Sequence, residues 1–315
     1  MKLLVTGGLG FIGSNFILDA LKNTNYEILN VDAEFYGSNH YNLIEVENSS
    51  KYSFVKGDIT DKKLMETLIS DCDYVVNFAA ESHVDRSILD PTPFLNSNIL
   101  GTFTILDIIK NQKKRLVHVS TDEVYGTILE GSATENTRFN PSSPYSATKA
   151  SAELLINSYV KTYDVDAVIT RCTNNYGPRQ FNEKLIPKTI GLCNENKKIP
   201  VYGTGTSIRD WIHVEDHCKA IMLVLEKGIT GESYNISSSN ELSNLTLVTK
   251  ILEILNKSEE NIQFVENRAG EDTRYSLDSS KIYQELGWIP MINFDEGLKK
   301  TIQWYISNKD WWKQG

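Results

Sequence analysis

The chain has 315 residues, 40% of them apolar, and a formal net charge of -9. This length allows a large core and favours two lobes. The negative charge disfavours nucleic acid and anionic membranes as partners, although a local basic pocket for a phosphorylated substrate is compatible with it. The four cysteines show no metal or redox spacing, and no apolar run approaches the ~20 residues that span a bilayer. We therefore expect a cytoplasmic protein without a metal site.

A strand, a glycine-rich turn and an amphipathic helix follow one another at the start of the chain, over residues 2–6, 7–13 and 14–21. Small residues in such a turn let the backbone approach a pyrophosphate at the helix N-terminus. A second strand over 27–31 ends in Asp32, an acid placed to bond an adenosine ribose and to repel a 2′-phosphate. The context predicts a dinucleotide site that binds NAD in preference to NADP.

Further strands are predicted over 52–57 and 74–80, and the second runs into a polar segment, 81–87. This segment suits a sugar ligand, or is an ordinary solvated loop. A helix over 93–111 carries an apolar stripe that is typical of a core or of a subunit contact. The alternation of strands and helices up to about residue 172 predicts an α/β fold, a Rossmann-type doubly wound parallel sheet.

Five reactive side chains gather in the next part of the chain: Thr121, Asp122, Glu123, Tyr145 and Lys149. The acids follow a short buried strand, so they lie where open α/β sheets place their ligands. Lys149 comes one helical turn after Tyr145, so the two side chains share a face. A cationic lysine favours the phenolate, and we expect it to lower the pKa of Tyr145 so that the phenol serves as a base. Two adjacent acids with separated pKa values suit general acid and base work, or form a solvated surface pair.

A loop over 172–178 begins a second, smaller α/β lobe that binds the substrate. The turn over 203–211 presents Arg209, which suits a diphosphate clamp or an ordinary ion pair. We predict an NAD-binding domain over 1–172, to which about 209–228 returns, and a substrate domain over 173–315.

The chain resembles the extended short-chain dehydrogenase/reductase family, the NAD-dependent epimerases and dehydratases, from Lys2 to Trp312. The landmarks are TGGLGFIG, NFAAESHVDRS, STDEVYG, PYSATKA, RCTNNYGPRQFNEKLIP and YGTGTSIRDWIHVEDH. Within the family it is similar to the nucleotide-sugar 4,6-dehydratases, because epimerases and decarboxylases typically carry Ser where Asp122 stands. The resemblance implies NAD, a nucleotide-diphosphate hexose substrate, and a homodimer that pairs the helices over 93–111 and 145–162.

The resemblance further implies 4,6-dehydration of dTDP-glucose to dTDP-4-dehydro-6-deoxy-glucose. Tyr145 takes the proton of the C4 hydroxyl while NAD takes the C4 hydride, and Thr121 bonds the C4 oxygen. Lys149 holds Tyr145 as phenolate and bonds the nicotinamide ribose. Glu123 removes the C5 proton, Asp122 protonates the C6 hydroxyl as it leaves, the hydride returns to C6, and C5 is reprotonated.

The pattern and the resemblance together assign two sets of binding residues. The cofactor set is Gly7, Gly10, Phe11, Ile12, Gly13, Asp32, Asp58, Ile59, Ala79, Ala80, Tyr145 and Lys149. The substrate set is Ser82, Thr121, Asn174, Lys184, Leu185, Pro200, Tyr202, Arg209, Asn244 and Arg268.

One position departs from the family pattern R-x-G-H-D-x-R-Y, because Glu271 replaces the usual His. An anion there disfavours a nearby phosphate unless Arg268 or Arg274 pairs with it. UDP-glucose and UDP-N-acetylglucosamine are therefore alternative substrates. A nucleotide-sugar 4-epimerase is less favoured, since epimerisation needs no acid at C6. A non-catalytic NAD-binding module is disfavoured by the retention of all five reactive side chains.

Overall fold

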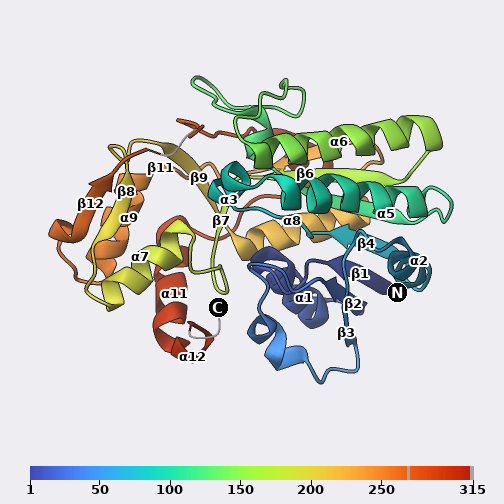
Figure 1. Ribbon diagram of the computed structural model, residues 1–315, viewed down its shortest axis with the longest axis horizontal. Helices are drawn as coiled ribbons and strands as arrows, with labels where there is room; N and C mark the ends of the chain where they lie inside the picture. The colour runs from blue at the N-terminus through green and yellow to red at the C-terminus, as the bar shows by residue number, and fades with distance from the viewer. Residues whose placement is uncertain (268–269, 313–315) are drawn as a thin grey trace.

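The computed structural model describes residues 1–267 and 270–312, and a seven-stranded parallel sheet forms its centre (Figure 1). The strand order is β10-β6-β5-β4-β1-β2-β3, so the direction of winding reverses between β1 and β4. This order confirms the predicted Rossmann-type sheet, whose ligands bind at that switch point. The strands are β1 Lys2–Thr6, β2 Glu27–Asp32, β3 Tyr52–Lys56, β4 Tyr74–Asn77, β5 Arg115–Thr121, β6 Ala167–Cys172 and β10 Ser233–Ile236.

Helices cover both faces of this sheet (Figure 1). Neighbouring residues of β1 enter different cores: Leu3 and Val5 pack toward one face and Leu4 toward the other. Both faces are buried, which explains why the strands are continuous apolar runs. One face carries α1 Phe11–Asn23, α8 Val214–Lys227 and α10 Ser280–Leu286, and the other carries α2 Lys62–Ser70, α5 Thr102–Ile109 and α6 Pro144–Tyr163.

The helix predicted over 93–111 contains a π turn. Short α3 Val84–Leu89 and α4 Thr92–Phe94 precede it, and the π segment η2 Leu95–Gly101 leads into α5. Within η2 the buried Asn98 amide donates to Glu81 O at 3.0 Å and to Thr148 Oγ1 at 2.9 Å. Such turns interrupt the regular apolar spacing, and they occur frequently at functional sites.

The start of α6 is fixed by a capping box. Ser143 Oγ accepts from the Ser146 backbone N–H at 3.1 Å, and Ser146 Oγ accepts from the Ser143 N–H at 3.1 Å. Pro144 occupies the first helical turn, where its missing N–H costs nothing. These residues place Tyr145 and Lys149 on the buried side of α6.

The second lobe contains two small sheets, β11-β9-β7 and β12-β8. The chain enters it after β6 and later returns to the large sheet, since α8 packs on α1 and β10 pairs with β6. No helix in the described part of the chain is long and apolar enough to cross a bilayer. The lobe comprises β7 Asn174–Tyr176, α7 Leu185–Asn194, β8 Ile199–Tyr202, β9 Ile208–His213, β11 Glu241–Ser243, α9 Asn244–Ile254, β12 Ile262–Val265, α11 Phe294–Ser307 and α12 Lys309–Trp312.

Candidate active site

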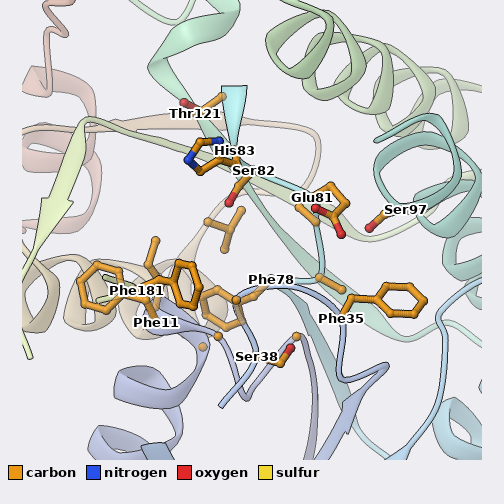
Figure 2. A pocket seen from close by; sticks show the side chains of 18 of the residues that line it. Phe11, Phe35, Ser38, Phe78, Glu81, Ser82, His83, Ser97, Thr121 and Phe181 are labelled. Atoms are coloured by element: carbon orange, nitrogen blue, oxygen red, sulfur yellow. The ribbon is translucent and has the colours of Figure 1, made fainter. Parts of the chain in front are cut away.

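A large cavity lies at the carboxyl ends of the central strands and extends to the second lobe (Figure 2). Its volume is about 320 Å³, at the lower end of the roughly 300–1,000 Å³ of a typical small-molecule site. Thr121, Ser82 and His83 lie toward the top of Figure 2, and Ser38 lies toward the bottom. The sequence-predicted residues that line it are Gly7, Gly10, Phe11, Ile12, Gly13, Asp32, Asp58, Ile59, Ala79, Ala80, Ser82, Thr121, Asp122, Glu123, Tyr145, Lys149, Asn174 and Lys184.

The glycine turn brings backbone to the cavity surface because side chains are excluded there. Gly7 has φ of +69°, and a Cβ on it would lie 2.6 Å from the backbone nitrogen of Ala79. A Cβ on Gly13 would lie 2.5 Å from Gly7 O. Gly10 caps α1 without a side-chain hydrogen bond, so the first amides of the helix are left for an anion.

Asp32 ends β2 at the cavity wall and organises the turn that follows. Its Oδ2 accepts from the Leu9 N–H at 3.0 Å, while Oδ1 accepts from the Glu34 N–H at 2.8 Å and from Ser38 Oγ at 2.7 Å. The carboxylate therefore ties the glycine turn to the loop after β2. Its place suits a ribose hydroxyl and opposes a 2′-phosphate.

Thr121, Asp122 and Glu123 follow β5 in a short turn, η3 Asp122–Tyr125. Thr121 Oγ1 accepts from the Glu123 N–H at 3.3 Å and donates to Asp122 Oδ1 at 3.1 Å. Asp122 is buried, and its Oδ2 has no hydrogen-bond partner among the described residues. Burial, and then the charge of Glu123, raise the pKa of Asp122 well above its usual value. A buried carboxyl with a raised pKa next to a second carboxyl group suits an acid–base pair.

Tyr145 and Lys149 both reach the cavity, but their electrostatics differ from the sequence-based expectation. Burial, and then the charge of Glu123, raise the pKa of Tyr145 well above its usual value. The Lys149 amine donates to Val119 O at 2.7 Å and lies 3.3 Å from His118 Nε2. Burial lowers the pKa of this amine to about 8. The lysine is held by β5, and acids rather than the lysine dominate the field at the phenol.

Glu271, the departure from the family pattern, is paired with Arg209. Its Oε1 lies 3.7 Å from Arg209 Nη2, and both side chains are almost fully buried. Arg209 also donates to Asp272 O at 2.9 Å and lies 4.3 Å over the ring of Tyr275. Arg268, one of the two arginines expected to pair with it, lies outside the described residues, and the other, Arg274, pairs with Glu241.

Some of the other predicted substrate residues line the cavity and others do not. Lys184 lines it, and its Nζ donates to Ser82 O at 3.4 Å across the two lobes. Asn174 lines it from the start of β7. The residues that are not part of its lining are Leu185, Pro200, Tyr202, Arg209 and Asn244.

Sequence reasoning missed an aromatic cluster in the cavity wall. Tyr36 lies between the Arg86 guanidinium, 3.8 Å over its ring, and Phe181, whose ring centroid is 4.9 Å away. His83 Nε2 pairs with Glu183 at 3.0 Å beside it. The cluster joins the loop after β2, α3 and the segment before α7. These three segments are distant in sequence, and no local pattern indicates their contact.

The sheet order, the glycine turn and the tyrosine–lysine pair at the cavity define a protein of the short-chain dehydrogenase/reductase class. Residues 4–301 match the family described as GDP-mannose 4,6 dehydratase. The chain belongs to this family.

Relatives resemble the chain over its whole length. A dTDP-glucose 4,6-dehydratase of Mycobacterium tuberculosis is 45% identical over 99% of this chain and 96% of its own. The crystal structure of a dTDP-glucose 4,6-dehydratase from Streptomyces venezuelae, with NAD bound, matches with a TM-score of 0.98 and 44% identity over 99% of both chains. A UDP-glucuronic acid 4-epimerase from Bacillus cereus matches with a TM-score of 0.93 and 31% identity, over 98% of this chain and 99% of its own.

Proposed function

We propose that this protein is an NAD-dependent dTDP-glucose 4,6-dehydratase, a hydro-lyase of deoxysugar biosynthesis. The observation that carries the proposal is the buried Asp122 next to Glu123, in one cavity with Tyr145, where burial raises the pKa of the Asp122 carboxyl. Oxidation at C4 alone needs only the tyrosine and lysine. The added acid and base are what elimination of water across C5 and C6 requires.

The residues present fit a bound NAD. The Gly7–Gly13 turn would offer amides to the pyrophosphate, Asp32 would bond the adenosine ribose, and Lys149, which lines the same cavity, would bond the nicotinamide ribose. When bound, NAD accepts a hydride from C4 and later returns it to C6.

Each reactive side chain has one role in this scheme. Tyr145 accepts the proton of the C4 hydroxyl, and the Lys149 ammonium supplies the positive charge that this phenolate needs in an acidic pocket. Thr121 bonds the C4 oxygen, and the C4 ketone makes the C5 hydrogen acidic. Glu123 removes that proton, and Asp122 protonates the C6 hydroxyl so that it leaves as water.

Substrate contacts remain part of the proposal. Ser82, Asn174 and Lys184 line the cavity and suit the hexose and the diphosphate. Arg209 partly neutralises Glu271, so the carboxylate at this position does not by itself exclude a dTDP-sugar. UDP-glucose and UDP-N-acetylglucosamine stay as alternative substrates.

A 4-epimerase is the second candidate, because the Bacillus cereus epimerase has the same fold at a TM-score of 0.93. Rotation of a C4 ketone needs no proton donor at C6. A buried, protonated Asp122 has no task in that reaction, and this favours the dehydratase.

We also propose a homodimer built on the sheet face that carries α5 and α6. These two helices lie side by side in Figure 1, and they and their neighbours expose large apolar side chains. Pairing with a second copy would bury this surface. The exposed apolar residues on this face are Ile88, Leu89, Leu95, Leu100, Phe103, Leu154 and Tyr163.

We propose a cytoplasmic location. All four cysteines are free and buried, in keeping with a reducing cytoplasm.

The deciding experiment incubates the protein and NAD separately with dTDP-glucose, UDP-glucose and UDP-N-acetylglucosamine, and follows each product by mass. Loss of one water from dTDP-glucose supports the proposal, and preference for a UDP-sugar keeps the reaction but changes the substrate. An isomeric product without loss of mass would establish the epimerase. No turnover of any sugar would favour the non-catalytic NAD-binding module. The Tyr145→Phe variant is the control that ties any turnover to this cavity.

A further inference from the structure

A row of buried polar side chains crosses three strands of the central sheet beneath the cavity. Thr6 of β1 pairs in register with Asn77 of β4, and Asn77 pairs in register with His118 of β5. Register partners on parallel strands point to the same face, so the three side chains lie side by side. Their exposed fractions are 0%, 1% and 1%.

The row is hydrogen-bonded from end to end and finishes on Lys149. Thr6 Oγ1 donates to Asn77 Oδ1 at 2.5 Å, and Asn77 Nδ2 lies 3.0 Å from His118 Nδ1. His118 Nε2 then lies 3.3 Å from Lys149 Nζ. At its other end, Thr6 Oγ1 accepts from the backbone N–H of Ala79, a cavity residue, at 3.3 Å. A buried polar row of this kind is costly unless its members are satisfied.

The donors and acceptors of the row depend on the charge of Lys149. A neutral imidazole has one donor and one acceptor nitrogen. When Asn77 donates to His118 Nδ1, the ring hydrogen is on Nε2, and Lys149 must accept it as a neutral amine. When Lys149 is an ammonium, Nε2 accepts, so the hydrogen is on Nδ1 and Asn77 must turn its carbonyl oxygen toward it. The Asn77 Nδ2 then faces Thr6 Oγ1, and the bond between these two residues reverses, with Thr6 as the acceptor. The oxygen and nitrogen ends of an amide are nearly equal in shape, so the space around Asn77 accommodates both orientations of its side chain.

The surroundings of Lys149 bring the pH at which it loses its proton, and at which the His118 tautomer changes, close to neutral. Burial lowers the pKa of His118 well below its usual value, so the ring stays neutral. Burial lowers the pKa of the Lys149 amine to about 8. The other titratable groups that act on Lys149 are Glu153, one turn further along α6, and Cys172 at the end of β6. Tyr145 lies one turn earlier on the same helix face.

We propose that His118 is a positioning residue for Lys149, and that its neutral ring changes tautomer when the lysine loses its proton. The row from Thr6 to His118 thereby adjusts to both charge states of the lysine and helps to set the pH at which it is charged. This inference rests on the proposed function, in which the Lys149 ammonium supports the Tyr145 phenolate.

Two substitutions at one position separate this role from a structural one. In His118→Gln the amide reaches the place of Nε2 and keeps an acceptor for Lys149. In His118→Asn the shorter amide reaches only the place of Nδ1, so it can satisfy Asn77 but not Lys149. Because hydrogen bonds to charged groups are strong, loss of this acceptor is expected to lower the pKa of Lys149 by about one unit, and His118→Gln is expected to change it little.

The direct test is nitrogen-15 NMR of the imidazole rings in the full-length protein without substrate, which depends on no turnover. The chain has five histidines, and the His118 signals are those lost in His118→Gln. We expect the Nδ1–H tautomer at about pH 6 and the Nε2–H tautomer at about pH 10. The pH midpoint of this change should equal the midpoint of the Lys149 titration, measured by carbon NMR of its side chain. A single tautomer throughout, or a positively charged ring above pH 6, would overturn the proposal.

Kinetics give the second readout. With the substrate that the mass assay identifies, the alkaline limb of C4 oxidation should move down by about one unit in His118→Asn and stay in place in His118→Gln. Equal losses of rate in both variants with an unmoved pH profile would indicate a structural residue only and refute the positioning role. Because NMR reads the row without turnover, it still decides the inference if the mass assay rejects the proposed function.

Discussion

Replacing Asp122 with Asn tests the assignment of the general acid, because it removes a proton donor and leaves shape and charge almost unchanged. Asp122 is buried with a raised pKa, so the carboxyl is expected to be neutral at neutral pH, as an amide is. The Thr121 hydroxyl can still donate to the oxygen that replaces Oδ1. We therefore expect unchanged substrate affinity and intact C4 oxidation.

The elimination step should lose what a positioned general acid contributes, about 10²–10⁴-fold in rate. Since each tenfold change in rate corresponds to about 1.36 kcal/mol, the barrier to loss of water rises by roughly 3–5 kcal/mol. Because oxidation is retained and elimination is slowed, reduced cofactor should accumulate on the protein after substrate is added.

Rapid mixing followed by nicotinamide absorbance measures that accumulation, and mass spectrometry of the quenched sugar measures loss of water. Glu123→Gln is the matched control, since loss of the proposed C5 base should also stall the reaction after oxidation. A variant Asp122→Asn that eliminates water at the wild-type rate would refute the role of Asp122. Loss of C4 oxidation itself would show that Asp122 is needed earlier, and would refute the assignment as well.

The raised pKa of Asp122 also has a consequence for stability. The native state keeps the proton above pH ~4, where the unfolded chain has released it, so the native state binds more protons. The free energy of unfolding contributed by this group therefore falls as pH rises from about 4 toward the native pKa, and Asp122→Asn removes that loss. The stability of the variant relative to wild type should increase with pH over this window in denaturant titrations.

Three further substitutions test other parts of the structure. In the native protein the buried Arg171 guanidinium lies 2.6 Å from Glu153 Oε2, and Glu153→Gln leaves it without a counterion. This variant should lower the free energy of unfolding, measured in denaturant, by about 3–5 kcal/mol. Replacing both residues with apolar ones should restore most of that stability. Gly7→Ala should weaken NAD binding, measured by calorimetry, at least tenfold, because the new Cβ would collide with the backbone of Ala79. Gly37→Ala is the control: this residue also has a positive φ, +90°, but open space around it, so the substitution should cost only about 1 kcal/mol of stability. Asp32→Ala should reduce the preference for NAD over NADP, and unchanged discrimination would contradict the role of that carboxylate.

Local patterns determined much of the central sheet. The strand over 2–6 was predicted with the limits of β1, and the strand over 74–80 proved shorter because β4 ends at Asn77, where the backbone leaves the sheet to line the cavity. The helix over 93–111 contains the π turn η2, which hydrophobic spacing does not predict, because a buried Asn98 bridges two other segments there.

What the sequence by itself determined about this protein was the order of the elements and the residue types at strand ends. Periodicity and glycine spacing are local properties, so they predicted the nucleotide fold, and the family resemblance at the adjacent acids indicated dehydration. Only the tertiary structure decided the electrostatics. It buried Asp122 and Tyr145 near one another, turned Lys149 toward His118, and paired Glu271 with Arg209. These interactions depend on desolvation and on neighbours tens of residues away, and no local pattern records them.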